Sequence, residues 1–255
     1  MNLLKGSSIV VFDECHHVSA EVIFKIAMKC GNALLVGLSA TPFRNYAPET
    51  IKIIAALGEV VYKVNIRDLI KDGFLCDAEI KILNYNNFES PALFDTYQDV
   101  VDKFIINNNE RNNVITSAVS IAPKPCLVLV DRIEHGENLW RKLFTEHEKV
   151  VFVHGGSKDR KLVFDNIKKN NYDVIIASKI YGEGVNFPNL KSLIIAGGGK
   201  SSVATVQKIG RLLRLFPGKD KAVIYDIEDK IKFLRQHFKK RLEIYEENFE
   251  VKYDE

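Results

Sequence analysis

The sequence has no apolar run approaching the roughly 20 residues of a membrane-spanning helix, and so offers no candidate for one. Residues 1–8 also lack a secretory signal pattern. The four cysteines, Cys15, Cys30, Cys76 and Cys126, are scattered and form no CxxC pair. We therefore expect reduced thiols in a cytoplasm-like compartment.

A strong excess of one charge is also absent. The formal net charge is +3 over 255 residues, which is too small to indicate a nucleic-acid partner by itself. The hydrophobic fraction of 46% and the charged fraction of 27% are ordinary for a globular protein. This length allows one large domain or two small ones, with ample core in either case.

Short apolar runs alternate with amphipathic helical patterns along most of the chain. The runs predict strands at Ser8–Phe12, Ala33–Leu38, Ile80–Leu83, Cys126–Val130, Val150–Val153, Val174–Ala177, Ser192–Ala196 and Ala222–Tyr225. The helical patterns lie at Ala20–Cys30, Tyr97–Ile106, Val114–Ala122, Glu134–Glu146, Asp159–Lys169 and Val203–Leu215. Several runs are continuously apolar, as in strands buried on both faces. The alternation predicts a parallel α/β sheet.

The pattern divides the chain into three parts. Residues 1–78 are expected to hold the remainder of a first α/β domain and a connector. Residues 79–228 form a complete second domain, and residues 229–255 form a charged, solvent-facing helix and tail. The polar tract 106–113 is expected to be a loop. A parallel sheet of two strands cannot cover both faces, so we expect the first domain to be incomplete at its amino end.

The stretch "IVVFDECHHV", Ile9–Val18, ends an apolar run in two carboxylates, a cysteine and two histidines. Ligands of open parallel sheets bind beyond the carboxyl ends of the strands, where Asp13 and Glu14 lie. One carboxylate and waters typically hold the Mg²⁺ of a nucleoside triphosphate, and a second carboxylate can activate the attacking water. Zinc would need three or four ligands, which consecutive Cys15–His17 do not supply. A polar strand end without function is the alternative for this motif alone.

Three further motifs follow in order: "GLSATPFR" at Gly37–Arg44, "ASKIYGEGVNFPNL" at Ala177–Leu190 and "QKIGRLLR" at Gln207–Arg214. Together with "DECH" they resemble motifs II, III, V and VI of a superfamily 2 DExH-box helicase, over Ile9–Asp226. "VFVHGGS" at Val151–Ser157 and the overall spacing are most similar to phage recombination helicases and their XPB-like relatives. The resemblance implies a RecA-like motor that uses ATP and Mg²⁺ and acts on DNA, with RNA not excluded. It would work in the cytoplasm or, if virus-encoded, in the host cell.

The resemblance also implies a role for each residue of the first two motifs. Asp13 would hold Mg²⁺, and Glu14 would position the attacking water. His16 would contact motif VI or the phosphates. Ser39 and Thr41 would couple the nucleotide state to the bound nucleic acid.

Motif V and the strand ends supply the remaining expected contacts. By resemblance, Ser178 would contact a nucleic-acid phosphate, while Gly184 and Asn186 would approach the nucleotide. Families of this type often carry Asp at the position of Asn186, which leaves one contact to ribose open. Motor domains of this type hold one strand by its backbone, largely without sequence preference. Further candidates for that contact, each with a plain loop residue as the alternative, are Arg132, His154 and Lys179.

Motif VI predicts a charged helix face. Gln207, Arg211 and Arg214 are spaced four and three residues apart and would share one side of a helix. Arginine forks donate two hydrogen bonds to oxyanions, so both arginines are candidate fingers for a γ-phosphate. A solvated basic face is the alternative. The expected buried side of this helix comprises Leu212, Leu213 and Leu215.

The loop that would cradle the phosphates is missing from this sequence. ATP motors of this class use GxxxxGK[ST], and no segment fits that spacing. "IIAGGGKSS" has Ile194 where the first glycine is required, and "HGGSK" at His154–Lys158 also fails. We expect the loop on a longer form of the polypeptide or on a companion chain, with this chain inactive alone. A non-catalytic nucleic-acid-binding remnant, a restriction-enzyme motor and an RNA helicase remain as alternatives.

Overall fold

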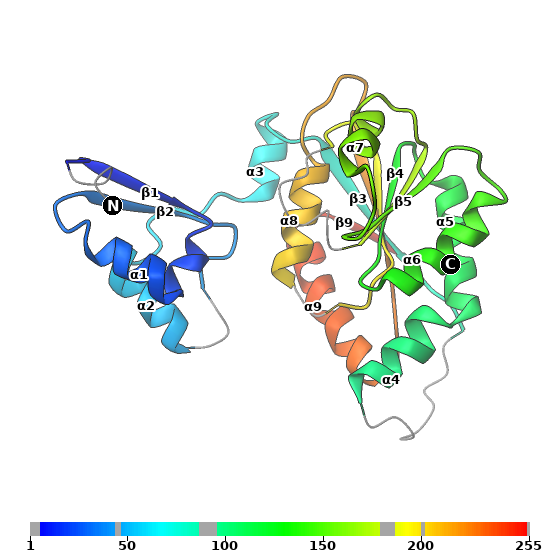
Figure 1. The fold of residues 1–255 in the computed structure, drawn as a ribbon, viewed down its shortest axis with the longest axis horizontal. Helices are drawn as coiled ribbons and strands as arrows, with labels where there is room; N and C mark the ends of the chain where they lie inside the picture. Colours follow the sequence, from blue (N-terminus) through cyan, green and yellow to red (C-terminus); the bar gives the residue numbers. More distant parts are fainter. Residues whose placement is uncertain (1–5, 44–46, 87–95, 179–186, 200–201, 254–255) are drawn as a thin grey trace. The chain divides into compact units, whose positions relative to one another are not determined.

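A computed structural model describes most of the chain, namely residues 6–43, 47–86, 96–178, 187–199 and 202–253. The chain divides into two units, Met1–Val64 and Asn65–Glu255, which are described separately (Figure 1). None of the helices in these ranges is long and apolar enough to cross a membrane.

The first unit is built on two parallel strands. Strand β1 (Ile9–Asp13) pairs with β2 (Leu34–Leu38) so that the last residues of both strands are neighbours. The crossover consists of a 3₁₀ turn, η2 (Cys15–Ser19), and helix α1 (Glu21–Met28). Helix α2 (Ala47–Leu57), which the sequence analysis did not predict, completes the unit.

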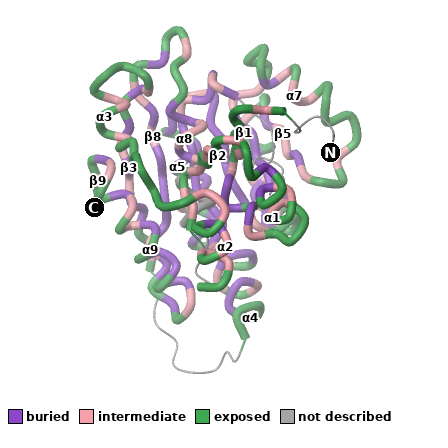
Figure 2. The backbone as a smooth tube through the Cα atoms, turned by 90° about the vertical axis from the view of Figure 1, so that its left-hand side faces the viewer, coloured by how far each residue is buried: buried purple, intermediate pink, exposed green. Residues whose placement is uncertain are grey.

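Only one face of this two-stranded sheet is covered. Phe12 and Leu35 pack with residues of α1, α2 and η2 into a small core. Figure 1 shows both helices on that side of the strands. On the other face Ile9, Val11 and Leu34 remain 58%, 54% and 63% exposed (Figure 2). That the first domain is incomplete at its amino end stays a prediction.

The second unit contains a seven-stranded sheet in which every described pairing is parallel. Its order is β5-β6-β4-β7-β8-β3-β9. The strands are β3 (Asp77–Leu83), β4 (Cys126–Leu129), β5 (Val150–Val153), β6 (Val174–Ala177), β7 (Ser192–Ile195), β8 (Lys221–Ile227) and β9 (Glu250–Tyr253). The predicted strands of this region are all present, and β9 is an addition.

Helices cover both faces of the large sheet. The described helices of this unit are α3 (Ile66–Lys71), α4 (Tyr97–Val101), α5 (Asn109–Ile121), α6 (Ile133–Phe144), α7 (Arg160–Lys168), α8 (Ser202–Leu212) and α9 (Lys232–Asn248). A π turn, η3 (Asp102–Ile106), continues α4. Alternate strand residues face opposite layers, as the two-residue period of a strand requires. Leu127 faces the core formed with α3, α7, α8 and α9, whereas Val128 faces the core formed with α5 and α6.

The second unit begins earlier in the chain than the expected end of the first part at residue 78. It includes α3 because Ile66 and Ile70 pack against its core. The Arg67 guanidinium also donates to the carbonyl of Glu246 at 3.0 Å. These contacts attach the expected connector to the second sheet.

Two local expectations are wrong. The C-terminal helix is not a solvent-facing tail, because α9 buries Leu234, Phe238 and Tyr245 and is followed by the sheet strand β9. The polar tract 106–113 is not all loop, because α5 begins at Asn109. The Asn108 side chain caps this helix by accepting from a backbone N–H, a role that suits asparagine.

Candidate nucleotide and nucleic-acid sites

The first candidate site lies where β1 ends. Asp13 is the last residue of the strand, and its exposed carboxylate accepts a hydrogen bond from the Glu14 backbone N–H at 2.9 Å. Glu14 has a φ of +50°, a left-handed conformation that is costly for a residue with a side chain. This turn ends the strand and starts η2, so both carboxylates lie at the carboxyl edge of the sheet.

His16 joins this strand end to the segment after β2. Its ring is 7% exposed, and its Nδ1 lies 3.2 Å from Glu14 Oε2 and 3.1 Å from Ser39 Oγ. Ser39 Oγ also accepts from the Thr41 backbone N–H at 3.2 Å. The "DECH" and "SAT" motifs are thus connected by hydrogen bonds.

These residues fit a magnesium-nucleotide better than a zinc ion. Among the described residues no group of three or more His, Cys, Asp and Glu side chains is placed to hold a metal. Mg²⁺ beside phosphates needs only one or two carboxylates and keeps several waters, which matches the exposed Asp13. The buried Thr41 Oγ1 has no hydrogen-bond partner among the described residues, so this hydroxyl can still form a hydrogen bond.

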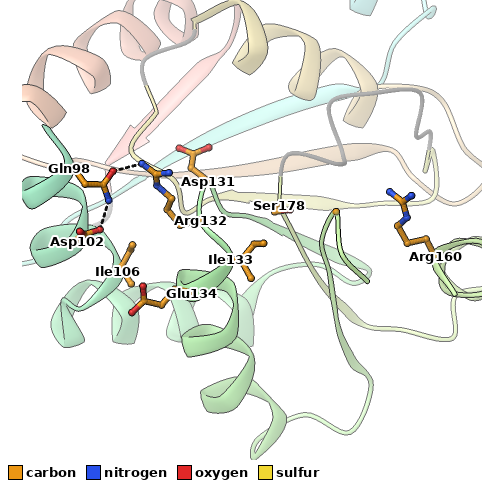
Figure 3. A pocket seen from close by; sticks show the side chains of 10 residues that line it. Gln98, Asp102, Ile106, Asp131, Arg132, Ile133, Glu134, Arg160 and Ser178 are labelled. Carbon is orange, nitrogen blue, oxygen red and sulfur yellow. Dashed lines mark hydrogen bonds between the residues drawn. The ribbon is translucent and has the colours of Figure 1, made fainter. Parts of the chain in front are cut away.

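The second candidate site is a cavity of about 720 Å³ at the carboxyl ends of β4, β5 and β6. Figure 3 shows Arg132 and Arg160 toward opposite ends of this pocket, with Ser178 between them in this view. Strand ends in parallel sheets are where ligands bind. The lining residues are Gln98, Asp102, Ile106, Asp131, Arg132, Ile133, Glu134, Gly155, Arg160 and Ser178.

Two of the predicted nucleic-acid residues line this pocket. Arg132 is the N-cap residue of α6 and is exposed, and Ser178 directly follows β6 and is 8% exposed. His154 follows β5 but is not among the lining residues, and its Nδ1 accepts from Gly156 N–H at 3.2 Å within its own turn. The predictions for Lys179, Gly184 and Asn186 fall outside the described residues.

Sequence reasoning missed Arg160 and Gln98. Arg160 is the first residue of α7, and its position after a strand–turn segment was the available signal. Gln98 lies on α4 and accepts a hydrogen bond from the Arg132 guanidinium, a contact between residues far apart in sequence. No local pattern indicates such a contact.

Motif VI departs from the predicted single helix face. Helix α8 ends at Leu212, so it carries Gln207 and Arg211 but not Arg214. Arg214 is exposed and forms an antiparallel bridge with Leu75. Leu215 is 55% exposed, so its predicted burial is wrong.

Donors from outside the helix bind the carbonyls at its end. The Lys219 ammonium donates to the carbonyls of Leu212 and Pro188, and the Cys76 N–H donates to the Leu213 carbonyl at 2.9 Å. Orphan carbonyls at a helix end need such donors. Burial lowers the pKa of Lys219, in part offset by the nearby Cys76 thiol.

The glycine-rich segment after β7 differs from a phosphate cradle. A cradle directs backbone N–H groups at the anion, whereas here the carbonyls are bound by cationic and imidazole groups of the interior. The three hydrogen bonds are Arg111 Nη1 to Ala196 O at 2.8 Å, His237 Nδ1 with Gly198 O at 3.0 Å and Arg241 Nη1 to Gly199 O at 3.2 Å.

These arginines are held by buried carboxylates. Arg111 pairs with Asp229 through Nε at 2.8 Å and Nη2 at 3.0 Å, and both side chains are 1% exposed. Arg241 pairs with Asp226 in the same two-bonded way, at 2.7 and 3.0 Å. Nearby, burial and the charge of Arg111 lower the pKa of His135 to about 3.

A parallel sheet of this order, with functional side chains at its carboxyl ends, defines an α/β fold of the RecA-like motor class. The comparisons with known proteins agree. Residues 98–216 match the helicase conserved C-terminal domain, and residues 2–44 match the res subunit of type III restriction enzymes. These matches are consistent with the C-terminal portion of a superfamily 2 helicase.

The individual relatives are distant but cover most of the chain. It is 26% identical over 256 residues to candidate helicase 22 of a Sulfolobus islandicus filamentous virus, covering 93% of this chain and 45% of that protein. It is 26% identical to the ATP-dependent DNA helicase uvsW of phage T4, covering 85% of this chain and 45% of uvsW. The chain therefore spans about half the length of these relatives.

Solved structures show the same fold. The crystal structure of T4 UvsW gives a TM-score of 0.57 at 22% identity, covering 99% of this chain and 54% of UvsW. A fragment of an HsdR restriction subunit from Vibrio vulnificus gives 0.69 at 18% identity, covering 97% and 47%. At these identities the likeness concerns the fold alone.

Proposed function

We propose that this chain is the motor portion of an ATP-dependent DNA helicase or translocase. The observation that carries the proposal is the contact of His16 with the Glu14 carboxylate at 3.2 Å and its hydrogen bond with Ser39. It connects the carboxylates at the end of β1 to the segment after β2, as coupling of ATP hydrolysis to movement requires. The match to the helicase domain and the intact second sheet support the same assignment.

The side chains at β1 would perform the hydrolytic chemistry. Asp13 would hold the magnesium ion, which supplies charge neutralisation for the phosphates when bound. Glu14 would orient and deprotonate the attacking water, and its bond to His16 fixes the carboxylate. Arg211 and Arg214 are the candidate fingers for the transferred phosphate, with Gln207 as a further nucleotide contact.

The second unit would hold the nucleic acid. The pocket presents Arg132 and Arg160 guanidiniums and the Ser178 hydroxyl, which are donors suited to backbone phosphates. Relatives named as a DNA helicase and as a DNA 3'-5' translocase favour DNA over RNA as the substrate. We propose that the protein acts in the cytoplasm or, if virus-encoded, in the host cell, and the viral and phage relatives support the second possibility.

The phosphate loop would come from a longer form of the polypeptide or from a companion chain. The uncovered apolar face of β1 and β2 gives such a segment a surface to pack against. Exposed apolar area of this kind commonly indicates an interaction site. A non-catalytic nucleic-acid-binding remnant is the second candidate, favoured by the contrast between the two-stranded first sheet and the complete second one.

One experiment tests the motor assignment. First, the intact mass of the endogenous protein is compared with 28.9 kDa, and the longer form or co-purifying complex is isolated. In that assembly Arg211→Ala and Arg214→Ala should each reduce DNA-stimulated ATP turnover by about 10³-fold or more if the residue is a finger. Binding of single-stranded DNA should stay nearly unchanged. Arg141→Ala, on the exposed side of α6, is the matched control.

The outcomes separate the candidates. If turnover survives within a factor of a few in both variants, the finger assignment is wrong. If no isolated assembly hydrolyses ATP although the chain binds DNA, the non-catalytic remnant replaces the motor.

A further inference from the structure

We propose that Gln98 is a positioning residue that presents the Arg132 guanidinium to a nucleic-acid phosphate. The inference rests on the proposed function of the second-unit pocket. Arg132 Nη2 donates to Gln98 Oε1, and Gln98 Nε2 donates to Asp102 Oδ1 at 2.6 Å. Figure 3 shows this relay along one end of the pocket.

The carboxylate sets the direction of the relay. Asp102 follows Gln98 by four residues, in the π turn that continues α4, so the two side chains are neighbours on one helical face. A carboxylate only accepts hydrogen bonds, so it selects the NH₂ end of the amide. The Gln98 carbonyl oxygen must then point away from Asp102, and it meets the guanidinium of Arg132.

The amide also separates two opposite charges. Asp102, Asp131 and Glu134 all line the pocket and would compete with a phosphate for its guanidiniums. Gln98 lies between Asp102 and Arg132 and satisfies both with neutral groups. The arginine keeps its full charge, and four of its five N–H donors remain for other acceptors.

A held arginine should bind better than a free one. An arginine side chain loses rotamer freedom when it contacts a phosphate, and a partner that restricts it beforehand lowers that cost. Arg160, at the other end of the pocket, has no hydrogen bond or ion pair within the described residues. The pocket therefore contains one tethered and one untethered guanidinium, which gives an internal control.

The experiment uses the 255-residue chain and a fluorescein-labelled single-stranded thymidine oligonucleotide, with affinity measured by anisotropy. Gln98→Met keeps the length and helix preference of the side chain but removes both hydrogen bonds. We expect it to weaken binding by about threefold to tenfold, the loss typical for releasing one restricted side chain. In the Arg132→Ala background the same change should have no effect, whereas in the Arg160→Ala background it should keep its full effect.

Two further variants address a merely structural role. Gln98→Glu places a carboxylate on Arg132, and we expect a larger loss of affinity than for Gln98→Met. The salt dependence should also fall, by about 0.7 in the slope of log affinity against log salt for one lost single-strand phosphate contact. Asp102→Asn can still accept from the amide and should bind DNA better than Asp102→Ala. Thermal unfolding of each variant is measured as well, so that a loss of affinity can be distinguished from a loss of stability.

The outcomes distinguish this inference from the proposed function. Coupling of Gln98 to Arg132 but not to Arg160, with the lower salt slope for Gln98→Glu, supports it. Two results would show that Gln98 does not position the arginine, provided that Arg132→Ala itself weakens binding. In the first, Gln98→Met has less than a twofold effect; in the second, its effect adds to that of Arg132→Ala. If neither Arg132→Ala nor Arg160→Ala weakens binding, the pocket is not a nucleic-acid site and both proposals fail.

Discussion

Removing the buried arginine of α9 should severely destabilise the second unit. Arg241 and Asp226 side chains are 2% and 1% exposed, and they share two hydrogen bonds at 2.7 and 3.0 Å. The Tyr245 hydroxyl donates to the same carboxylate at 2.7 Å. In Arg241→Met the apolar stem is largely replaced, but Asp226 is left as a buried charge without its cation. The Gly199 carbonyl also loses its donor.

The size of the effect follows from the cost of an unpaired buried charge. Breaking a buried pair by removing one partner typically costs about 3–5 kcal/mol. The free energy of unfolding of a whole protein is only about 5–15 kcal/mol. For a domain of about 150–250 residues each kcal/mol lowers the melting temperature by about 2–4 °C, so we expect a decrease of roughly 6–20 °C.

Urea and thermal unfolding, followed by circular dichroism, measure both quantities. The double variant Arg241→Met with Asp226→Asn removes the unpaired charge and should recover at least half of the lost stability, since the charge causes most of the penalty. Arg141→Met breaks an exposed pair with Glu137, 3.7 Å apart, and should change stability by less than about 1 kcal/mol. A loss below about 1 kcal/mol for Arg241→Met, or a double variant as unstable as the sum of the single ones, would refute the reasoning.

Two more stability predictions concern buried bases. The depressed pKa of His135, about 3, means that the unfolded chain binds more protons than the folded one between roughly pH 3 and 6.5. The free energy of unfolding should therefore fall as the pH falls through that window, by about 2 kcal/mol between pH 6.5 and 5. His135→Gln should flatten this pH dependence. The control variant, His17→Gln at an exposed position, should not. Lys219→Met leaves the Leu212 and Pro188 carbonyls without their donor and should lower the free energy of unfolding by about 2–4 kcal/mol, measured with urea at pH 7. A variant as stable as the parent would contradict the stabilising role of these two hydrogen bonds.

The strands were predictable because their signal is local. Four consecutive apolar residues in Val150–Val153 and Val174–Ala177 are typical of strands buried on both faces, and the structure has both with those bounds. Strand β9 lacks that signal. Its Glu250 and Lys252 alternate with apolar residues, and Lys252 pairs with Glu79 of β3 at 3.1 Å across the sheet. An edge strand of this kind depends on its neighbour.

The end of α8 was not predictable from its own residues. The repeating pattern of the "QKIGRLLR" segment continues past Leu212, and propensity alone would extend the helix. Lys219, seven residues further along the chain, and the distant Cys76 donate to the carbonyls at this helix end instead. This long-range competition moves Arg214 off the helix face that its spacing predicted.

Some residues of the candidate sites could be predicted from local sequence, and others could not. Asp13, Glu14 and Ser39 could be predicted as neighbours because they lie at the ends of two apolar runs, and strand ends of a parallel sheet converge. The structure brings His16 into contact with Glu14 and into a hydrogen bond with Ser39. Gln98 carries no such signal, because an isolated glutamine on a short helix is ordinary and its partner arginine lies on another element.

The glycine-rich segment after β7 shows why pattern spacing alone does not define a phosphate loop. A Cβ at Gly197 or Gly199 would come within 2.5 or 2.7 Å of the Asp131 carboxylate, so a side chain at either position would displace that carboxylate. Asp131 lines the pocket beside Arg132, and the carbonyls of the same segment are bound by buried arginines. The segment therefore links the ion pairs of the core to the wall of the pocket. Its glycines leave room for the Asp131 carboxylate in the wall of the proposed nucleic-acid site.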